Sequence, residues 1–264
     1  MESRRRLHTL VDELQAGGRY SFTRRELEGL SERSEVALRS ALRRLKEKGR
    51  IASPRRGFYV IVPIEYRSAG SPPPSWFVDD FMAYLDQPYY VGLLSAAAIH
   101  GAAHQQPMVF QVVTDRPTRP ARVGRSRIEF HISHQVSSIP VINAQTETGT
   151  MRVSTPEATA LDLVYYLDAS GQLGNVATVL SELAEEMDGH ALAAVAAYYP
   201  TPTSQRLGYL LNVLGEDKRV RELAVWLSGQ RRRPVPLVPG KPAGQAPGDP
   251  RWRVIANEAV EADS

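Results

Sequence analysis

The amino-acid sequence predicts an α+β protein in which a small basic N-terminal domain precedes a larger mixed α/β domain. Three observations support this fold class. Residues 1–62 show three helical patterns and then a β-hairpin. They carry 15 Lys and Arg against 8 Asp and Glu (+7), whereas the other 202 residues carry 17 against 21 (−4). A proline-rich segment, residues 64–75, follows the basic part. We therefore expect a first domain over residues 1–63, a linker over 64–75 and a second domain over 76–264.

The first two helices are predicted from apolar spacing and capping residues. Leucine and valine at helical spacing predict a helix over residues 7–14, which Gly17 and Gly18 end. Thr23 and Glu26 have the spacing of a capping box, in which each side chain accepts from the backbone N–H of the other residue. This pair predicts a second, short helix that carries Leu27 and Leu30.

The third helix has both an apolar stripe and a basic ridge. Ser34 is a good N-cap, and Glu35 places a carboxylate in the first turn, where the helix dipole favours it. Leucines at positions 38, 42 and 45 form one apolar stripe, and Arg39, Arg43 and Lys46 form a ridge one residue further on. Gly49 ends the helix.

A β-hairpin is predicted directly after the third helix. Residues 50–53 and 58–62 pair as strands, and residues 54–57 (Pro-Arg-Arg-Gly) have the composition of a turn. Three helices and a hairpin within about sixty residues match the plan of a winged helix-turn-helix. In that plan the third helix enters the major groove of a DNA duplex, and the hairpin reaches a phosphate or the minor groove.

The plan also predicts which side chains contact DNA. Residues at the start of the second helix would bind the sugar-phosphate backbone, those on the third helix would approach base edges, and the hairpin arginines would contact a phosphate or the minor groove. The predicted DNA-binding residues are Thr23, Arg24, Arg25, Arg33, Ser34, Glu35, Arg39, Arg43, Lys46, Arg55 and Arg56.

The second domain alternates helical and strand patterns. Helices are expected over residues 76–85, 89–103, from 155 onwards, and over 176–187, 191–197, 205–214 and 220–227. Strands are expected over 108–114, 127–132 and 141–153, with a basic, proline-bearing loop over 116–125. Residues 229–250 are rich in proline and glycine, which favours an extended or mobile segment, and residues 251–259 could return as a strand.

No motif in the sequence predicts catalysis, a cofactor or a metal. His100 and His104 are four residues apart, but Gly101 stands where a zinc protease needs glutamate. His131 and His134 lack a ligand framework, and Ser95 does not lie in a hydrolase nucleophile elbow. Glu157 and Asp162 are five residues apart and do not share a helix face. We expect no catalytic residue, no cofactor and no metal site.

Composition excludes other classes of protein. No apolar run reaches the roughly 18 residues that span a bilayer, and Arg4-Arg5-Arg6 is not followed by the apolar core of a signal peptide. The absence of cysteine excludes disulfides and thiolate metal sites. We expect a cytoplasmic protein without a membrane partner.

The sequence also resembles a known family over nearly its whole length. Specific stretches, in order, are LRRLKEKGRI with PRRGFYVIVP (residues 42–63), YYVGLLSAA with HGAAH (89–104), FQVVT (110–114), STPEATALDL (154–163) and QRLGYL (205–210). With these, the chain resembles the AbiEi-type antitoxins of the AbiE abortive-infection (type IV) toxin–antitoxin systems, a bacterial phage defence.

The resemblance implies a partner and a role. The partner would be an AbiEii-type toxin with a nucleotidyltransferase fold, counteracted through direct binding or only functionally. The antitoxin would also repress its own operon by binding inverted repeats in promoter DNA. The sequence contains no zipper long enough to enforce a dimer, so we expect a monomer in solution that binds the repeats side by side, about 34 Å or a multiple of it apart.

Two other functions remain open from the sequence. The second domain could be an enzyme that modifies the toxin or a nucleotide, in which case His100, His104, Glu157 and Asp162 would surround one pocket. It could instead be the sensor of a one-component transcriptional regulator, which predicts a closed apolar pocket with a few converging polar groups.

Overall fold

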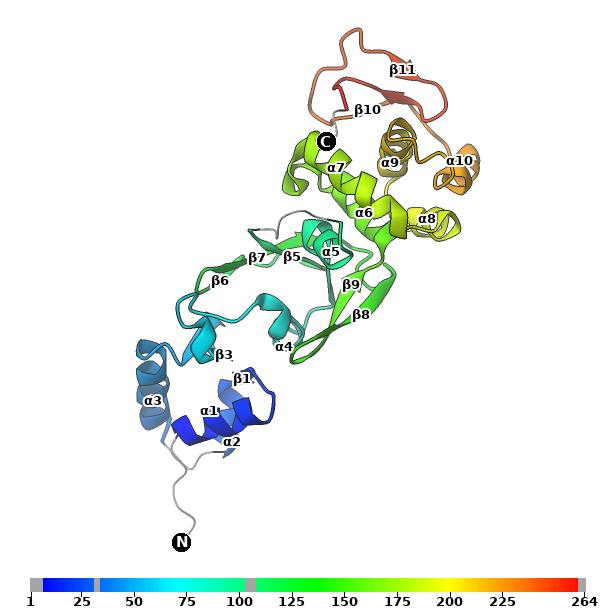
Figure 1. Cartoon of the computed structure of the whole chain (residues 1–264). Helices are drawn as coiled ribbons and strands as arrows, with labels where there is room; N and C mark the ends of the chain where they lie inside the picture. Colours follow the sequence, from blue (N-terminus) through cyan, green and yellow to red (C-terminus); the bar gives the residue numbers. More distant parts are fainter. Residues whose placement is uncertain (1–6, 31–33, 103–107, 261–264) are drawn as a thin grey trace. The chain divides into compact units, whose positions relative to one another are not determined.

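The computed structural model describes residues 7–30, 34–102 and 108–260 (Figure 1). Within these ranges the chain forms ten α-helices and three β-sheets, which confirms the mixed α/β content. Arg33, His104 and the run Arg4-Arg5-Arg6, which the sequence analysis singled out, lie outside the described ranges.

The first elements follow the predicted order of helices and hairpin, with one short strand added. They are α1 (Leu7–Ala16), β1 (Ser21–Thr23), α2 (Arg24–Leu30), α3 (Glu35–Glu47), β2 (Ile51–Arg55) and β3 (Phe58–Ile61). The strands form a sheet in the order β1-β3-β2, and both pairs are antiparallel. In this sheet Phe22 pairs with Tyr59 and Ala52 with Val60.

Local chemistry explains where α2 and α3 begin and end. The Thr23 N–H donates to Glu26 Oε2 (2.6 Å), and the Glu26 N–H donates to Thr23 Oγ1 (3.2 Å), so the predicted capping box is present. The Ala37 N–H donates to the Ser34 hydroxyl (3.3 Å) at the start of α3. Gly49 follows α3 with φ +62°, a left-handed conformation that favours glycine.

A small core holds these elements together. Its buried residues are Leu7, Val11, Phe22, Leu27, Leu38, Ala41, Leu42, Leu45, Ile51 and Ile61. The leucine stripe of α3 faces this core, as the spacing predicted. Each fully buried leucine stabilises the fold by roughly 1.5–3 kcal/mol, so this stripe fixes which face of α3 remains available to solvent.

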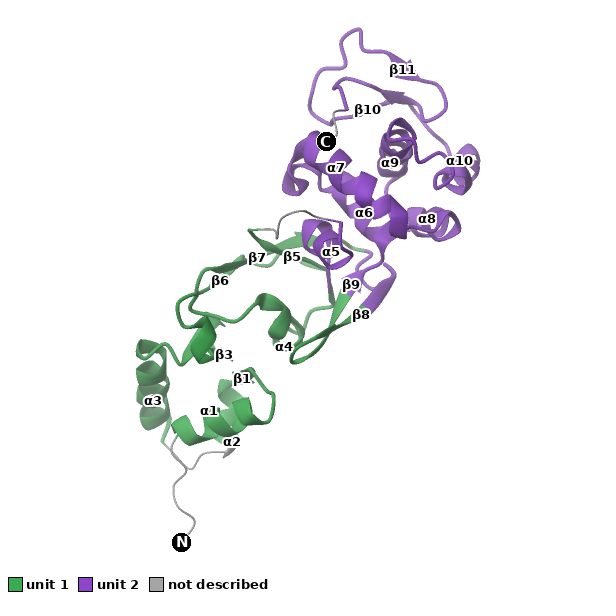
Figure 2. Cartoon of the chain, in the orientation of Figure 1, with its two compact units in different colours: residues 1–89, 108–134, 143–152 green, residues 90–107, 135–142, 153–264 purple. Residues whose placement is uncertain are grey.

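The chain divides into two compact units, and it enters each of them more than once (Figure 2). Unit 1 contains residues 1–89, 108–134 and 143–152, and unit 2 contains residues 90–107, 135–142 and 153–264. The segment predicted as a linker, residues 64–75, lies within unit 1 and includes two short 3-10 helices, Ile64–Tyr66 and Pro74–Trp76. Ser71 in this segment is buried.

Unit 1 continues beyond the first six elements. Helix α4 (Val78–Leu85) buries Phe81, whose ring lies 5.1 Å from that of Phe58 in β3. Three strands follow one another side by side in the order β6 (Ala121–Val123), β7 (Ser126–Ile132) and β5 (Phe110–Thr114). The β5–β7 pair is parallel and the β6–β7 pair is antiparallel. Strands β8 (Val141–Thr146) and β9 (Gly149–Ser154) follow; residues 143–152 belong to unit 1.

Unit 2 is mainly helical. Its helices are α5 (Leu93–Ile99), α6 (Pro156–Tyr165), α7 (Gln172–Leu183), α8 (Gly189–Val195), α9 (Thr201–Val213) and α10 (Arg221–Ser228). The helix predicted over residues 89–103 is wrong at its start, because Tyr89–Val91 is strand β4, in which Val91 pairs with Val153. Two aromatic residues and a valine favour a strand there, and Gly92 is extended just before α5 begins.

The C-terminal part of unit 2 is a small sheet. Strands β10 (Val235–Pro236), β12 (Val254–Ile255) and β11 (Gly248–Asp249) lie in that order, so the strand expected within residues 251–259 is present in short form. Trp252 is fully buried. The Gln205 side-chain amide of α9 donates to three carbonyl oxygens, those of Arg233 (3.1 Å), Trp252 (2.9 Å) and Arg253 (3.2 Å).

No helix in the described ranges is both long and apolar enough to cross a bilayer.

Candidate nucleic-acid interface

Helix α3 presents a charged face beside its leucine stripe. Glu35, Arg39, Arg43 and Lys46 are exposed, whereas Leu38 and Leu42 are buried. The sequence predicted that Arg39, Arg43 and Lys46 form one ridge because they recur at helical spacing, and all three are exposed on the helix.

The start of α2 lies against the turn of the hairpin. The Arg24 backbone N–H donates to the Gly57 carbonyl oxygen at 2.8 Å, which fixes the turn beside α2. Arg24 is half-buried and Arg25 is exposed. Thr23 is half-buried, and its hydroxyl and backbone N–H both bond to Glu26.

Acidic side chains hold several of these arginines in place. Glu35 Oε1 accepts from Arg24 (2.8 Å) and from Arg39 (2.9 Å), while Arg24 also bonds to Glu28 (2.8 Å). Hydrogen bonds from Arg24 and then Arg39 hold the pKa of the Glu35 carboxyl below its ordinary value. These pairs are exposed, so they stabilise the fold little, and another anion would compete for the same guanidinium groups.

The hairpin turn is tighter than predicted. Strand β2 extends to Arg55, which pairs with Phe58, so the turn itself consists of Arg56 and Gly57. Gly57 has φ +87°, and a Cβ atom there would lie 2.6 Å from the hydroxyl oxygen of Tyr84. That hydroxyl donates to the Arg56 carbonyl at 2.7 Å. The turn is therefore held by α4 as well as by α2.

A cavity of about 580 Å³ opens between α3 and this turn. Most of the predicted DNA-binding side chains line it: Arg24, Arg39, Arg43, Lys46, Arg55 and Arg56. A second cavity of about 760 Å³ shares Arg24, Arg39 and Arg56 with the first and adds Glu28 and Tyr84. We call the first one the helix–hairpin cavity; it is an open, predominantly cationic groove.

The other predicted side chains have different positions. The Ser34 hydroxyl caps α3, and Arg25 does not line the helix–hairpin cavity. Arg44, which the sequence did not single out, lies elsewhere on α3 and lines a separate cavity with residues of α1.

The residues considered for catalysis make separate contacts. His100 Nε2 lies 2.7 Å from the Ser154 carbonyl oxygen, and the Glu157 carboxylate accepts from the Asp188 N–H at 2.8 Å. Ser95 is buried in α5, and His131 is half-buried in β7 of unit 1, where burial lowers its pKa. Among the described residues, no group of three or more His, Asp and Glu could hold a metal ion.

Asp162 is an unusual buried acid that the sequence analysis considered only as half of a carboxylate pair. Its Oδ1 accepts from the hydroxyls of Tyr199 (2.8 Å) and Tyr90 (3.2 Å). Its Oδ2 is buried without a hydrogen-bond partner among the described residues. Burial raises the pKa of the Asp162 carboxyl to about 7, although both tyrosines favour the charged form. The one signal in the sequence is a lone acid in the apolar run ATALDLVYYL.

Comparisons with known proteins give a family match for one part of the chain. Residues 90–213 match a family model described as the AbiEi antitoxin C-terminal domain. The structure is similar to the crystal structure of the RV2827C protein from Mycobacterium tuberculosis, with a TM-score of 0.68, 16% sequence identity, and coverage of 96% of this chain and 92% of that one. At this identity the likeness concerns the fold alone. No curated protein sequence matches the chain. Residues 90–213 therefore correspond to the C-terminal domain of AbiEi-type antitoxins.

Proposed function

We propose that this antitoxin counteracts a nucleotidyltransferase-like toxin and represses its own operon by binding inverted repeats in promoter DNA. The antitoxin family that residues 90–213 match implies a toxin partner in general. The toxin class is carried over from the sequence resemblance. The DNA-binding part of the proposal is carried by one observation: six cationic side chains from α2, α3 and the hairpin converge on the helix–hairpin cavity.

We further propose that residues 7–62 act as a winged helix-turn-helix. A helix with its side chains is about 10–12 Å wide, and the major groove is about 12 Å wide, so α3 can enter the groove with its charged face toward the bases. Arg39 and Glu35 then approach base edges, because guanidinium groups pair with guanine and carboxylates accept from cytosine. Arg24 and Arg25, on α2, and Thr23, which precedes that helix, contact phosphates.

Binding to inverted repeats adds a geometric requirement. Two copies of the protein on one operator would place their α3 helices about 34 Å apart, or a multiple of it, on one side of the duplex. We propose that the protein is a monomer in solution and that the promoter, rather than a protein interface, brings two copies together. Sedimentation of the free protein and of its complex with promoter DNA would test this.

The first test compares two arginines on the same helix. Arg39→Ala removes a charge from the helix–hairpin cavity, and Arg44→Ala removes the same charge from the separate cavity beside α1. We expect Arg39→Ala to weaken binding to the promoter by about 1–3 kcal/mol and to reduce its preference over random DNA, because a bidentate base contact is lost. Arg44→Ala should change little. Fluorescence anisotropy with both duplexes measures the two effects.

The antitoxin role needs its own readout. The neighbouring open reading frame would be expressed with the full chain, with the Arg39→Ala variant or alone. Rescue from toxicity by the variant as well as by the wild type would separate antitoxicity from DNA binding. If Arg39→Ala and Arg44→Ala bind the promoter equally well, the assignment of α3 is wrong; if the neighbour is not toxic, the toxin assignment is wrong.

A further inference from the structure

Helix α3 carries one exposed apolar side chain that the proposed DNA contacts leave out. Val36 lies in the first turn of the helix and is 70% exposed. Among the described residues up to position 62, no other large apolar side chain is exposed. Valine is also a poorer helix former than alanine, because its branched side chain loses rotamer freedom against the preceding turn. Neither packing nor helix propensity therefore accounts for a valine at this position.

Val36 stands on the face of α3 that points away from the small core. At about 100° per residue, Val36 lies about 180° around the helix from Leu45 and about 160° from Leu38, and both leucines are buried. Ser40, one turn further on, is exposed on the same face as Val36. We call these two uncharged residues, Val36 and Ser40, the neutral strip. It runs beside the basic ridge of the helix.

An exposed hydrocarbon side chain can recognise only one group on the edge of a base pair. In the major groove thymine presents a C5-methyl group, whereas the remaining groups are hydrogen-bond donors or acceptors. Valine neither donates nor accepts, so it gains free energy by burying the thymine methyl against its own methyl groups. Opposite cytosine, the same side chain would leave the N4 amino group without a partner. Valine at this position would therefore favour a T·A pair over a C·G pair.

Two ion pairs direct the charged neighbours of Val36 to one side. Glu35 Oε1 accepts from Arg24 of α2 at 2.8 Å and from Arg39 at 2.9 Å. The Glu35 carboxylate is thereby held toward α2, and the Arg39 guanidinium is held toward Glu35. The first turn of α3 therefore presents an apolar side chain on its outer face, with charges at the side.

Contact between two methyl groups requires a rigid frame. A gap of about 0.5–1 Å already removes roughly a quarter to a half of the dispersion attraction between two atoms. Hydrogen bonds within unit 1 supply this rigidity. The Arg24 N–H donates to the Gly57 carbonyl of the hairpin turn at 2.8 Å, and the Tyr84 hydroxyl of α4 donates to the Arg56 carbonyl at 2.7 Å. Helix α2, the hairpin turn and α4 are therefore linked to one another.

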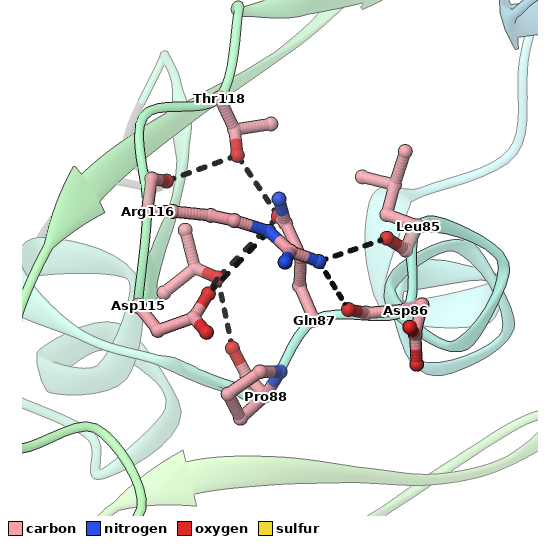
Figure 3. A network of polar contacts seen from close by, with 8 residues as sticks. Leu85, Asp86, Gln87, Pro88, Asp115, Arg116 and Thr118 are labelled. Carbon is pink, nitrogen blue, oxygen red and sulfur yellow. Dashed lines mark hydrogen bonds and ion pairs between the residues drawn. The ribbon is translucent and has the colours of Figure 1, made fainter.

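The end of α4 is fixed in turn by the loop after β5. The Arg116 guanidinium donates to the carbonyl oxygens of Leu85 and Asp86 (Figure 3). Through these bonds the loop, α4, the hairpin turn and α2 form one hydrogen-bonded frame. The ion pair between Glu35 and Arg24 attaches the start of α3 to this frame, so the first turn of α3 has a defined position relative to the elements around it.

We infer that Val36 is a specificity-determining residue that contacts the C5-methyl group of a thymine in each half of the promoter repeat. The inference rests on the proposed DNA-binding function, and it names the kind of base pair that the first turn of α3 selects. The hydroxyl of Ser40, about 6 Å further along the helix axis, can bond to a neighbouring base of any kind. The basic ridge attracts the phosphates, and the neutral strip reads the base edges.

Replacing thymine by uracil tests this contact, because uracil pairs with adenine in the same way and lacks only the methyl group. Anisotropy would be measured with the full-length protein and a set of promoter duplexes, each with uracil at one symmetry-related pair of thymine positions. Val36→Ala removes the valine methyl groups from α3. Val225→Ala is the matched control, since Val225 is 69% exposed and lies in α10 of unit 2. Because alanine is the better helix former, Val36→Ala should unfold at the temperature of the wild type or above it.

The effects of the two changes should not add. At the thymine that Val36 contacts, uracil should weaken binding of the wild type and of Val225→Ala by about 4-fold per half-site, the value for one buried methyl group. Val36→Ala should bind the unmodified promoter about 4-fold more weakly per half-site than the wild type and lose nothing further with uracil there. All three proteins should bind a random duplex of the same length equally, because their charges are equal.

Other results would overturn the inference in distinguishable ways. If uracil weakens binding at no position while Arg39→Ala is impaired, the proposed function stands and Val36 does not contact a thymine. If uracil weakens the wild type and Val36→Ala equally at every sensitive position, another side chain or the shape of the DNA senses the methyl group. If the wild type binds neither the promoter nor the random duplex, the proposed DNA-binding function has failed and the inference fails with it.

Discussion

At the scale of single residues, Asp162 is the clearest case of chemistry that only the fold creates. Its carboxyl lies in the apolar interior of unit 2 and is bonded by two tyrosines, one 72 and one 37 residues away in the chain. Local spacing carries no information about partners so far away. The sequence could therefore exclude a carboxylate pair with Glu157, but it could not predict the site that Asp162 occupies.

The raised pKa of Asp162 predicts a pH-dependent stability. The ordinary pKa of aspartate is near 4 and burial raises that of Asp162 to about 7, so between these values the folded state keeps a proton that the unfolded state releases. The contribution of Asp162 to the free energy of unfolding should be highest below about pH 4, fall as the pH rises to about 7, and then level off. At about 1.4 kcal/mol per pKa unit, the fall is at most about 4 kcal/mol.

Asp162→Asn should remove this dependence, because the amide does not ionise. Urea denaturation at several pH values between about 4 and about 8 measures it, and Asp168→Asn, at an exposed position, is the matched control. If the free energy of unfolding changes with pH in the same way for the wild type and for Asp162→Asn, the Asp162 carboxyl is not the source of the pH dependence.

At the scale of elements, the sequence predicts best where local chemistry starts or ends a helix. The capping box of α2 and the N-cap Ser34 lie where they were expected, and Thr155 caps the helix that was expected from residue 155 onwards. The start of α5 was missed because residues 89–91 are aromatic and β-branched, which suits either a buried helix or a strand, and only the pairing with Val153 decides. The predicted turn was also too long, since strand pairing continues to Arg55.

Packing between α9 and the C-terminal segment gives a prediction at this scale. A Cβ atom on Gly208, in α9, would lie 2.1 Å from the buried indole ring of Trp252. Gly208→Ala should therefore destabilise the protein by about 1–3 kcal/mol, although alanine is the better helix former by about 1 kcal/mol. Gly229→Ala is the control, because its nearest neighbouring atom is 3.6 Å away. Urea denaturation followed by tryptophan fluorescence measures both; equal stability would mean that the indole moves aside.

At the scale of the whole molecule, the order of elements in the first sixty residues was predictable, but the extent of the surrounding unit was not. Hairpin residues pack on α4, and the tyrosine at position 20 contacts Trp76 with ring centroids 4.8 Å apart. Proline-rich composition suggested a linker between these parts. The composition of a segment indicates only its local stiffness. Whether the segment packs against the rest of the protein depends on residues that are distant in sequence.

Two fragments of different length would test whether the N-terminal fold depends on residues beyond 70. A fragment of residues 1–70 lacks the ring of Phe81 that covers buried Phe58, whereas residues 1–89 retain it. We expect the shorter fragment to lose roughly 1.5–3 kcal/mol of unfolding free energy. Residues 1–89 with Phe81→Ala should resemble it in urea denaturation followed by circular dichroism. Equal stability of fragments 1–70 and 1–89 would instead favour the boundary at residue 63.

The three carbonyl bonds of Gln205 have a consequence for protein engineering. Because one side chain of α9 holds both Arg233 and Trp252, the proline- and glycine-rich stretch between them is a loop whose two ends are already fixed together. Lengthening such a loop costs little entropy, about 0.6 kcal/mol for each doubling. Gly244, which is exposed with no other side chain near it, is thus a natural position at which to insert a fluorescent tag without unfolding the antitoxin domain.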